Sequence, residues 1–252
     1  NGVKANTPVT IKADVEQGTG GHVHADTLQR PKGFLYSDQT ANTCDSVQPA
    51  ACITGLTDIN GQFVFTFLAS QVSGNHTVTA TCDVCNGGKA DLAIKVAVKP
   101  ELIPIPDSPL YALKDSKGVV IGAKAGTHEA NHFLTSSAIT KLEELAGIYA
   151  AIYPGAVLYL NDASLKGGGL LDVGSTSWSS PHSAHRKGTS LDIRAANSGP
   201  NSEGAVPTTV FKEFLKDANA NKKFRLGLHC KNSTDTNYCL GQPNNRHFHV
   251  DF

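Results

Sequence analysis

The sequence contains no methionine, only one tryptophan and no long apolar run. A membrane-spanning helix needs about 20 consecutive apolar residues, so no span is predicted. Lys+Arg and Asp+Glu are equal at 22 each, so the chain lacks the basic excess typical of proteins that bind nucleic acid or anionic membranes. Because the chain starts at Asn1 and has no Met, we expect a processed mature form whose signal peptide has been removed.

The cysteines support export. All six fall in three local pairs, Cys44 with Cys52, Cys82 with Cys85, and Cys230 with Cys239, and each pair brackets loop-like sequence. A redox or zinc-knuckle reading of Cys82-Asp-Val-Cys85 is less favoured, because the motif follows a β-like run and no second CxxC exists. We therefore expect disulfides and a secreted or periplasmic location.

The 252 residues are enough for two compact domains. Short segments with alternating apolar and polar residues, separated by Gly- and Asn-rich turns, occur at residues 8–15, 63–67, 76–81 and 90–98. This pattern predicts an all-β, immunoglobulin-like antiparallel sandwich over residues 1–99. The stretches 57–63 and 74–80 resemble the bacterial Ig-like modules that are common on exported proteins.

A proline-rich segment, residues 100–109, follows and contains four prolines. It cannot form a helix and is expected to be a linker. Residues 110–252 then have a mixed pattern that predicts an α+β domain with an antiparallel sheet. The predicted strands are a hairpin of 111–113 and 119–121, then 156–160, a strand around Asp192, 224–228 and 247–252.

Two helices are predicted in this second domain. Thr135 to Ser137 cap the first, which runs to about Tyr153 and ends at Pro154-Gly155. Its apolar stripe is Ile139, Leu142, Leu145, Ala146, Tyr149 and Ile152. The second helix covers residues 207–218 and begins at Pro207.

Two histidine motifs in this domain carry metal-binding chemistry. The first is His182-Ser-Ala-His185-Arg-Lys-Gly188-Thr-Ser-Leu-Asp192, and the second is His247-Phe248-His249. In a strand, residues two apart point to the same face, so His247 and His249 should project together. Imidazoles and one carboxylate, with a coordination position left for water, form the ligand set of a catalytic zinc site.

These motifs, His-x-x-Gly-x-x-x-Asp and a later His-x-His, resemble those of the lysostaphin/D-Ala-D-Ala metallopeptidase/hedgehog superfamily. The additional His182 makes penicillin-insensitive murein endopeptidases the most similar group. The resemblance implies that His185, Asp192 and His249 bind Zn²⁺, and that His247 and His182 are catalytic. No Glu precedes His247 in the manner of the D-Ala-D-Ala branch, so the identity of the base stays open between these two histidines.

Residues near the motifs are candidates for binding substrate. Asp162 and Ser164 lie in a polar segment before the motif and could form the rim of the cleft. Trp178 and Arg186 flank the first motif, where an aromatic ring and a cation suit a peptide with free carboxylates.

A competing zinc motif, His128-Glu129-Ala-Asn-His132, formally matches HExxH. A zincin needs this motif on a long helix, but Gly126-Thr127 precede it and a new helix cap follows at Thr135. His22 and His24 also form a His-x-His pair, for which a polar sheet face is the simpler interpretation.

The leading hypothesis is a secreted zinc peptidase that hydrolyses peptide bonds of bacterial peptidoglycan with metal-activated water. One alternative is an exported zinc-containing binding or adhesion protein without hydrolytic activity. Another is a zincin that uses His128, Glu129 and His132. The sequence gives neither the bond cleaved nor the oligomeric state.

Overall fold

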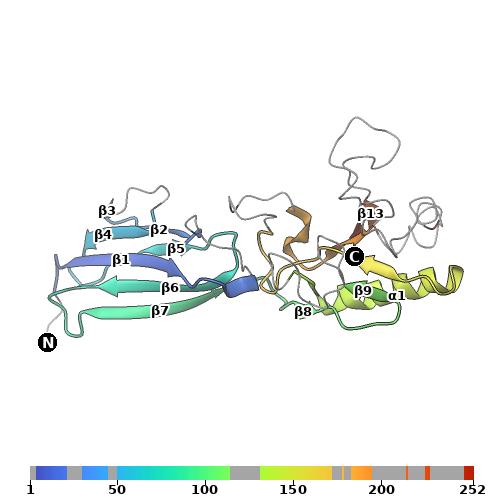
Figure 1. Ribbon diagram of the computed structural model, residues 1–252. Coiled ribbons are helices and arrows are strands. Elements are labelled where there is room, and N and C mark those ends of the chain that lie inside the picture. The colour runs from blue at the N-terminus through green and yellow to red at the C-terminus, as the bar shows by residue number, and fades with distance from the viewer. Residues whose placement is uncertain are drawn as a thin grey trace. The chain divides into compact units, whose positions relative to one another are not determined.

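The computed structural model describes residues 4–21, 30–44, 50–113, 131–171, 178, 183–194, 214, 225–227 and 247–252. The chain divides into two compact units (Figure 1). Unit 1 consists of residues 1–20 and 25–97, and unit 2 consists mainly of residues 98–252.

Unit 1 contains a five-stranded antiparallel sheet with the order β3-β4-β1-β6-β7. Figure 1 shows these strands side by side. A second, two-stranded antiparallel sheet pairs β2 with β5. The strands are β1 (Pro8–Val15), β2 (Phe34–Tyr36), β3 (Ala41–Thr43), β4 (Cys52–Leu56), β5 (Thr66–Leu68), β6 (Gly74–Thr81) and β7 (Lys89–Val96).

The alternation along β1 explains the core of unit 1. Ile11 and Ala13 point inward and pack with Leu35, Ile53 and Val78 from the neighbouring strands. The predictions for β1, β6 and β7 are confirmed within one or two residues at each end. The predicted strand 63–67 is displaced, because the observed β5 begins only at Thr66.

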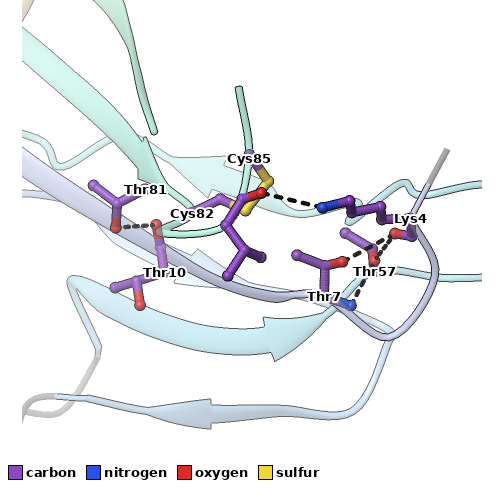
Figure 2. Close-up of a disulfide and its surroundings, with 8 residues drawn as sticks. Lys4, Thr7, Thr10, Thr57, Thr81, Cys82 and Cys85 are labelled. Atoms are coloured by element: carbon purple, nitrogen blue, oxygen red, sulfur yellow. Dashed lines mark hydrogen bonds between the residues drawn. A yellow bond between two sulfur atoms is a disulfide. The ribbon is translucent and has the colours of Figure 1, made fainter. Parts of the chain in front are cut away.

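Two of the predicted disulfides are confirmed. Cys44 is bonded to Cys52, and Cys82 to Cys85; Cys230 and Cys239 lie outside the described residues. Figure 2 shows that the loop closed by Cys82 and Cys85 contacts the start of the chain, where Lys4 Nζ lies 3.5 Å from the carbonyl oxygen of Val84. The short disulfide loop therefore contacts the segment that precedes β1.

Unit 2 contains a five-stranded sheet with the order β13-β14-β12-β11-β9. Its strands are β9 (Tyr111–Leu113), β11 (Leu158–Leu160), β12 (Ser190–Arg194), β13 (Arg225–Gly227) and β14 (His247–Asp251). All pairs are antiparallel except β9 with β11, which are parallel. The predicted antiparallel sheet is therefore wrong at this pair: β9 and β11 are connected through a helix, as parallel neighbours require.

The helix α1 (Ser136–Ile152) covers the apolar face of this sheet. The Thr135 side chain accepts a hydrogen bond from the backbone N–H of Ala138, which confirms the predicted N-cap. Five residues of the predicted stripe are buried, whereas the sixth, Ile152 in the last turn, is 45% exposed. Of the second predicted helix only Phe214 is described, and its ring packs against Tyr149.

The proline-rich segment is part of the packed structure of unit 2. Ile103–Pro104 form β8, which pairs with β10 (Phe133–Leu134). Leu102 and Ile105 on either side are buried, and Ile105 belongs to the main core. Within the described ranges, α1 and the shorter helical turns fall short of the length and apolarity that crossing a bilayer requires.

Candidate metal centre

The two central strands of unit 2 separate an apolar face from a polar one. β12 and β14 pair so that Asp192 lies opposite His249. The intervening residues Leu191, Ile193, Phe248 and Val250 are all buried in the core beneath α1. Because alternate residues of a strand point to opposite faces, Asp192 and His249 lie together on the other face of the sheet. Core packing therefore fixes the register that brings the carboxylate beside the imidazole.

A short 3₁₀ turn, Ser183–Arg186, brings His185 to the same face. The Ser164 hydroxyl donates a hydrogen bond to the carbonyl oxygen of His185 and accepts one, at 2.8 Å, from the backbone N–H of Gly188. Ser164 thus contacts the backbone both within the turn, at His185, and just after it, at Gly188. It is fully buried, and these contacts are with the backbone of the protein itself.

Gly188 allows the chain to turn from His185 into β12. Its φ is +70°, a conformation that L side chains rarely adopt. A Cβ atom there would lie 2.3 Å from Leu102 Cδ2, and the Gly188 carbonyl accepts the backbone N–H of Thr135 at 2.8 Å. Glycine at position 188, between the two candidate ligands His185 and Asp192, is therefore required both by its conformation and by close packing.

The three predicted metal ligands converge. Asp192 Oδ1 lies 2.8 Å from His249 Nδ1 and 3.3 Å from His185 Nε2. The two imidazole rings meet edge to face, with centroids 4.9 Å apart. One donor atom from each of the three residues lies within 4.8 Å of the others, and all three side chains are buried.

The electrostatics of this cluster favour a cation. Burial alone would lower the pKa of His249, but the hydrogen bond to Asp192 and the charges of Asp192 and Asp251 outweigh it and raise the pKa above 6.5. A buried carboxylate needs a compensating positive charge, and here either a protonated imidazole or a metal ion can provide it. Two imidazoles with one carboxylate form a donor set that could hold a metal ion, and these are ligand types that zinc accepts.

Asp162 lies next to the cluster. Burial and the nearby charge of Asp192 raise the pKa of its carboxyl to about 6. Asn131 Nδ2 donates to one carboxyl oxygen at 2.8 Å and Asn161 Nδ2 to the other at 3.1 Å. The backbone carbonyl of Asp162 also accepts the N–H of Asp192 at 2.7 Å. These contacts fix Asp162 beside the strand that carries a metal ligand.

The remaining predicted site residues are less fully described. His182 lies outside the described residues, and of His247 only the backbone, at the start of β14, is described. Arg186 and Trp178 are partly exposed, and Trp178 has a φ of 47°.

Only the end of the competing zinc motif, Asn131 and His132, lies within the described residues. His132 is buried, directly precedes β10 and is not in a helix; residues 128–130 lie outside the described ranges, as do His22 and His24. Among the described residues, His185, Asp192 and His249 form the one group of three or more side chains that could hold a metal ion.

Sequence reasoning placed Asn161 in the polar segment of Asp162 and Ser164 but gave no role to Asn131 or Asp251. Asp251 Oδ1 lies 3.2 Å from His249 Nε2. The two-residue period of a strand already indicated that Asp251 shares a face with His249. No comparable signal pointed to the contacts of Asn131 and Asn161 with Asp162, because these contacts depend on how the segments beside β10 and β11 approach each other.

Neither a protein-family model nor a curated protein sequence matches this chain.

Proposed function

We propose that this chain is an extracytoplasmic zinc peptidase that hydrolyses peptide bonds in bacterial peptidoglycan, in the manner of murein endopeptidases. The observation that carries the proposal is the buried convergence of His185, Asp192 and His249 on one point. These are the residues to which the sequence resemblance assigns the metal. The two disulfides, which are typical of exported proteins, support the location.

His185, Asp192 and His249 would hold the ion. Zinc at such a site supplies Lewis acidity, which activates water and polarises the carbonyl group to be cleaved. Asp192 sets the position of both imidazoles, because its Oδ1 contacts a nitrogen of each. The hydroxyl of Ser164 and the bend at Gly188 hold the turn that carries His185, so the site is preorganised by residues outside the ligand set.

The proton-handling groups in this proposal are His247 and His182, as the resemblance implies. The two-residue period of a strand is the reason to expect His247 and His249 to project together. Arg186 and Trp178 are assigned to substrate binding because they flank the turn of His185. Asp162, whose carboxyl is oriented by two amides, would be available on the substrate side. In the same proposal, unit 1 is an Ig-like module that precedes a peptidase domain.

The test compares two buried histidines. His249→Ala should abolish zinc retention and the release of muropeptides from purified peptidoglycan, whereas the wild type should retain one zinc per chain. The matched control is His76→Gln in unit 1, a histidine that is also buried; this variant should keep its zinc and its activity. Circular dichroism establishes that both variants are folded.

Undiminished muropeptide release by His249→Ala would contradict the proposal. Zinc bound at these three residues without muropeptide release would favour the non-hydrolytic binding or adhesion protein instead. A site closed by a fourth protein ligand would favour the same alternative.

A further inference from the structure

Asp251 ends β14 on the face that carries the metal centre. Its side chain is 50% exposed, and its Oδ1 lies 3.2 Å from Nε2 of His249. The register of the strand keeps it there, because Phe248 and Val250 on the opposite face are buried in the core. The carboxylate of Asp251 therefore stands behind His249, on the side of the ring away from Asp192.

The two nitrogens of His249 face different carboxylates. Nδ1 lies 2.8 Å from Asp192 Oδ1, the atom that His185 Nε2 also approaches at 3.3 Å. Nδ1 is therefore the nitrogen that points into the cluster. A neutral imidazole carries one N–H, so if Nδ1 gives its lone pair to a cation, the proton resides on Nε2. That N–H can then donate to Asp251.

We propose that Asp251 is a positioning residue that fixes the tautomer and the ring orientation of His249 for metal binding through Nδ1. The inference rests on the proposed metal site. A carboxylate that accepts the second N–H of a ligating histidine holds the ring in place and increases its basicity. On the other side of β14, Gly227 pairs with His249 and has no side chain that could compete for this position.

The contact between Asp251 and His249 differs from an ion pair between two exposed side chains, which contributes little to stability. His249 is 4% exposed, and burial opposes charge on its ring, so each hydrogen bond to the ring is made in a largely dehydrated setting. The exposed partner, Asp251, remains hydrated and loses little on forming the contact. Its effect is therefore on the orientation of His249 rather than on overall stability.

The test measures zinc affinity and the tautomer of His249 in Asp251→Ala, Asp251→Asn and Asp251→Glu. Asp251→Ala should weaken zinc binding by about 10- to 100-fold, measured by competition with a chromophoric chelator. Asp251→Asn should fall between Asp251→Ala and the wild type, since its amide oxygen accepts the hydrogen bond without a charge. Asp251→Glu should recover part of the affinity.

Nitrogen-15 NMR of the zinc-loaded protein provides a second readout. The wild type should show His249 with its proton on Nε2 and zinc on Nδ1, and Asp251→Ala should show faster exchange of that proton. The matched control is Asp91→Asn, which removes another exposed carboxylate hydrogen-bonded on a strand, in unit 1. It should leave the zinc affinity and the spectrum of His249 unchanged.

Zinc affinity of Asp251→Ala within twofold of the wild type, with an unchanged Nε2 proton, would overturn the inference. If the wild type binds zinc at the cluster but releases no muropeptides, the peptidase proposal fails, while weakened zinc binding by Asp251→Ala still supports the role of Asp251. If the wild type binds no zinc at His249, both proposals are overturned.

Discussion

Each unit contains buried histidine, but the surroundings give these residues opposite properties. His76 in unit 1 is 1% exposed, and its Nδ1 lies 3.2 Å from the carbonyl oxygen of Lys32. Burial, helped by the charge of Arg30, lowers its pKa below 6.5. His249 in unit 2 is similarly buried, yet its contacts with Asp192 and Asp251 raise its pKa. The difference comes from the hydrogen-bond partners and not from the depth of burial.

This comparison shows what separates a structural histidine from a candidate ligand. His76 has a pKa lowered mainly by burial, contacts the carbonyl oxygen of Lys32 and packs near the ring of Phe67, with centroids 5.8 Å apart. His185 and His249 share one carboxylate oxygen and offer nitrogens to the same point. A single buried imidazole can fill space in a core, whereas two that converge on a carboxylate form a group that could hold a cation.

The largest expected difference between the units is their response to metal. Zinc at 100 times its Kd should stabilise unit 2 by about 2.7 kcal/mol if it binds only the folded state. Hydrogen exchange followed by mass spectrometry should show stronger protection of β12 and β14 with zinc than with EDTA, and no change in β1 or β6.

Asp192→Asn provides the control, because it removes the charge that both imidazoles contact. The response of unit 2 to zinc should disappear in this variant. Equal protection of both units by zinc, or zinc-dependent protection of unit 2 that persists in Asp192→Asn, would contradict the claim that only unit 2 binds the metal through this cluster.

A smaller effect concerns the bend that carries His185. Gly188→Ala should destabilise unit 2 by at least about 1–2 kcal/mol for the positive φ alone, with a further cost because its Cβ would meet Leu102 at 2.3 Å. Denaturant unfolding and zinc affinity should both reveal the loss. Gly155→Ala is the matched control, since its φ is +82° but no atom lies within 4 Å of the added Cβ. Equal losses in the two variants would show that the contact with Leu102 does not matter.

The smallest effect is a pH dependence of unit 1. The pKa of His76 is lower in the folded state than in the unfolded state. The stability that its neutral form allows is therefore fully present above about pH 6.5, and the free energy of unfolding decreases as the pH falls below that value. One such group changes the free energy of unfolding by at most about 1.4 kcal/mol per pH unit. Hydrogen exchange in β6 should accelerate accordingly between pH 6.5 and lower pH, after correction for intrinsic rates.

His76→Gln should remove this part of the pH dependence without altering that of β14. If the wild type and His76→Gln lose protection in β6 to the same degree on acidification, His76 is not the group responsible.

Several elements were predictable because their signals are local. The alternation in β1, the Thr135 cap with the apolar stripe of α1, and the disulfides between close cysteines all depend on short stretches of sequence. The members of the candidate metal cluster were also predictable, since the two motifs contain them, although only the pairing of β12 with β14 brings Asp192 beside His249.

Other features depend on tertiary contacts that no local pattern records. The parallel pairing of β9 with β11 requires the crossover through α1. Ile152 in the last turn is exposed, although the next residue, Tyr153, packs against the core. Ser164 was predicted to bind substrate at the rim of a cleft, and the structure places its hydroxyl between His185 and Gly188 instead. Sequence identifies a polar residue near a site, but its partner depends on the fold.

The most direct test of the central claim is X-ray absorption at the zinc edge, combined with anomalous scattering from a crystal of the zinc-loaded protein. The account predicts one zinc with two imidazole nitrogens at about 2.0–2.1 Å, one carboxylate oxygen at about 2.0–2.2 Å, and a further position that protein does not fill. The nitrogens should be His185 Nε2 and His249 Nδ1, and the oxygen should come from Asp192. An anomalous peak at other residues, or none at this cluster with zinc in excess, would contradict it.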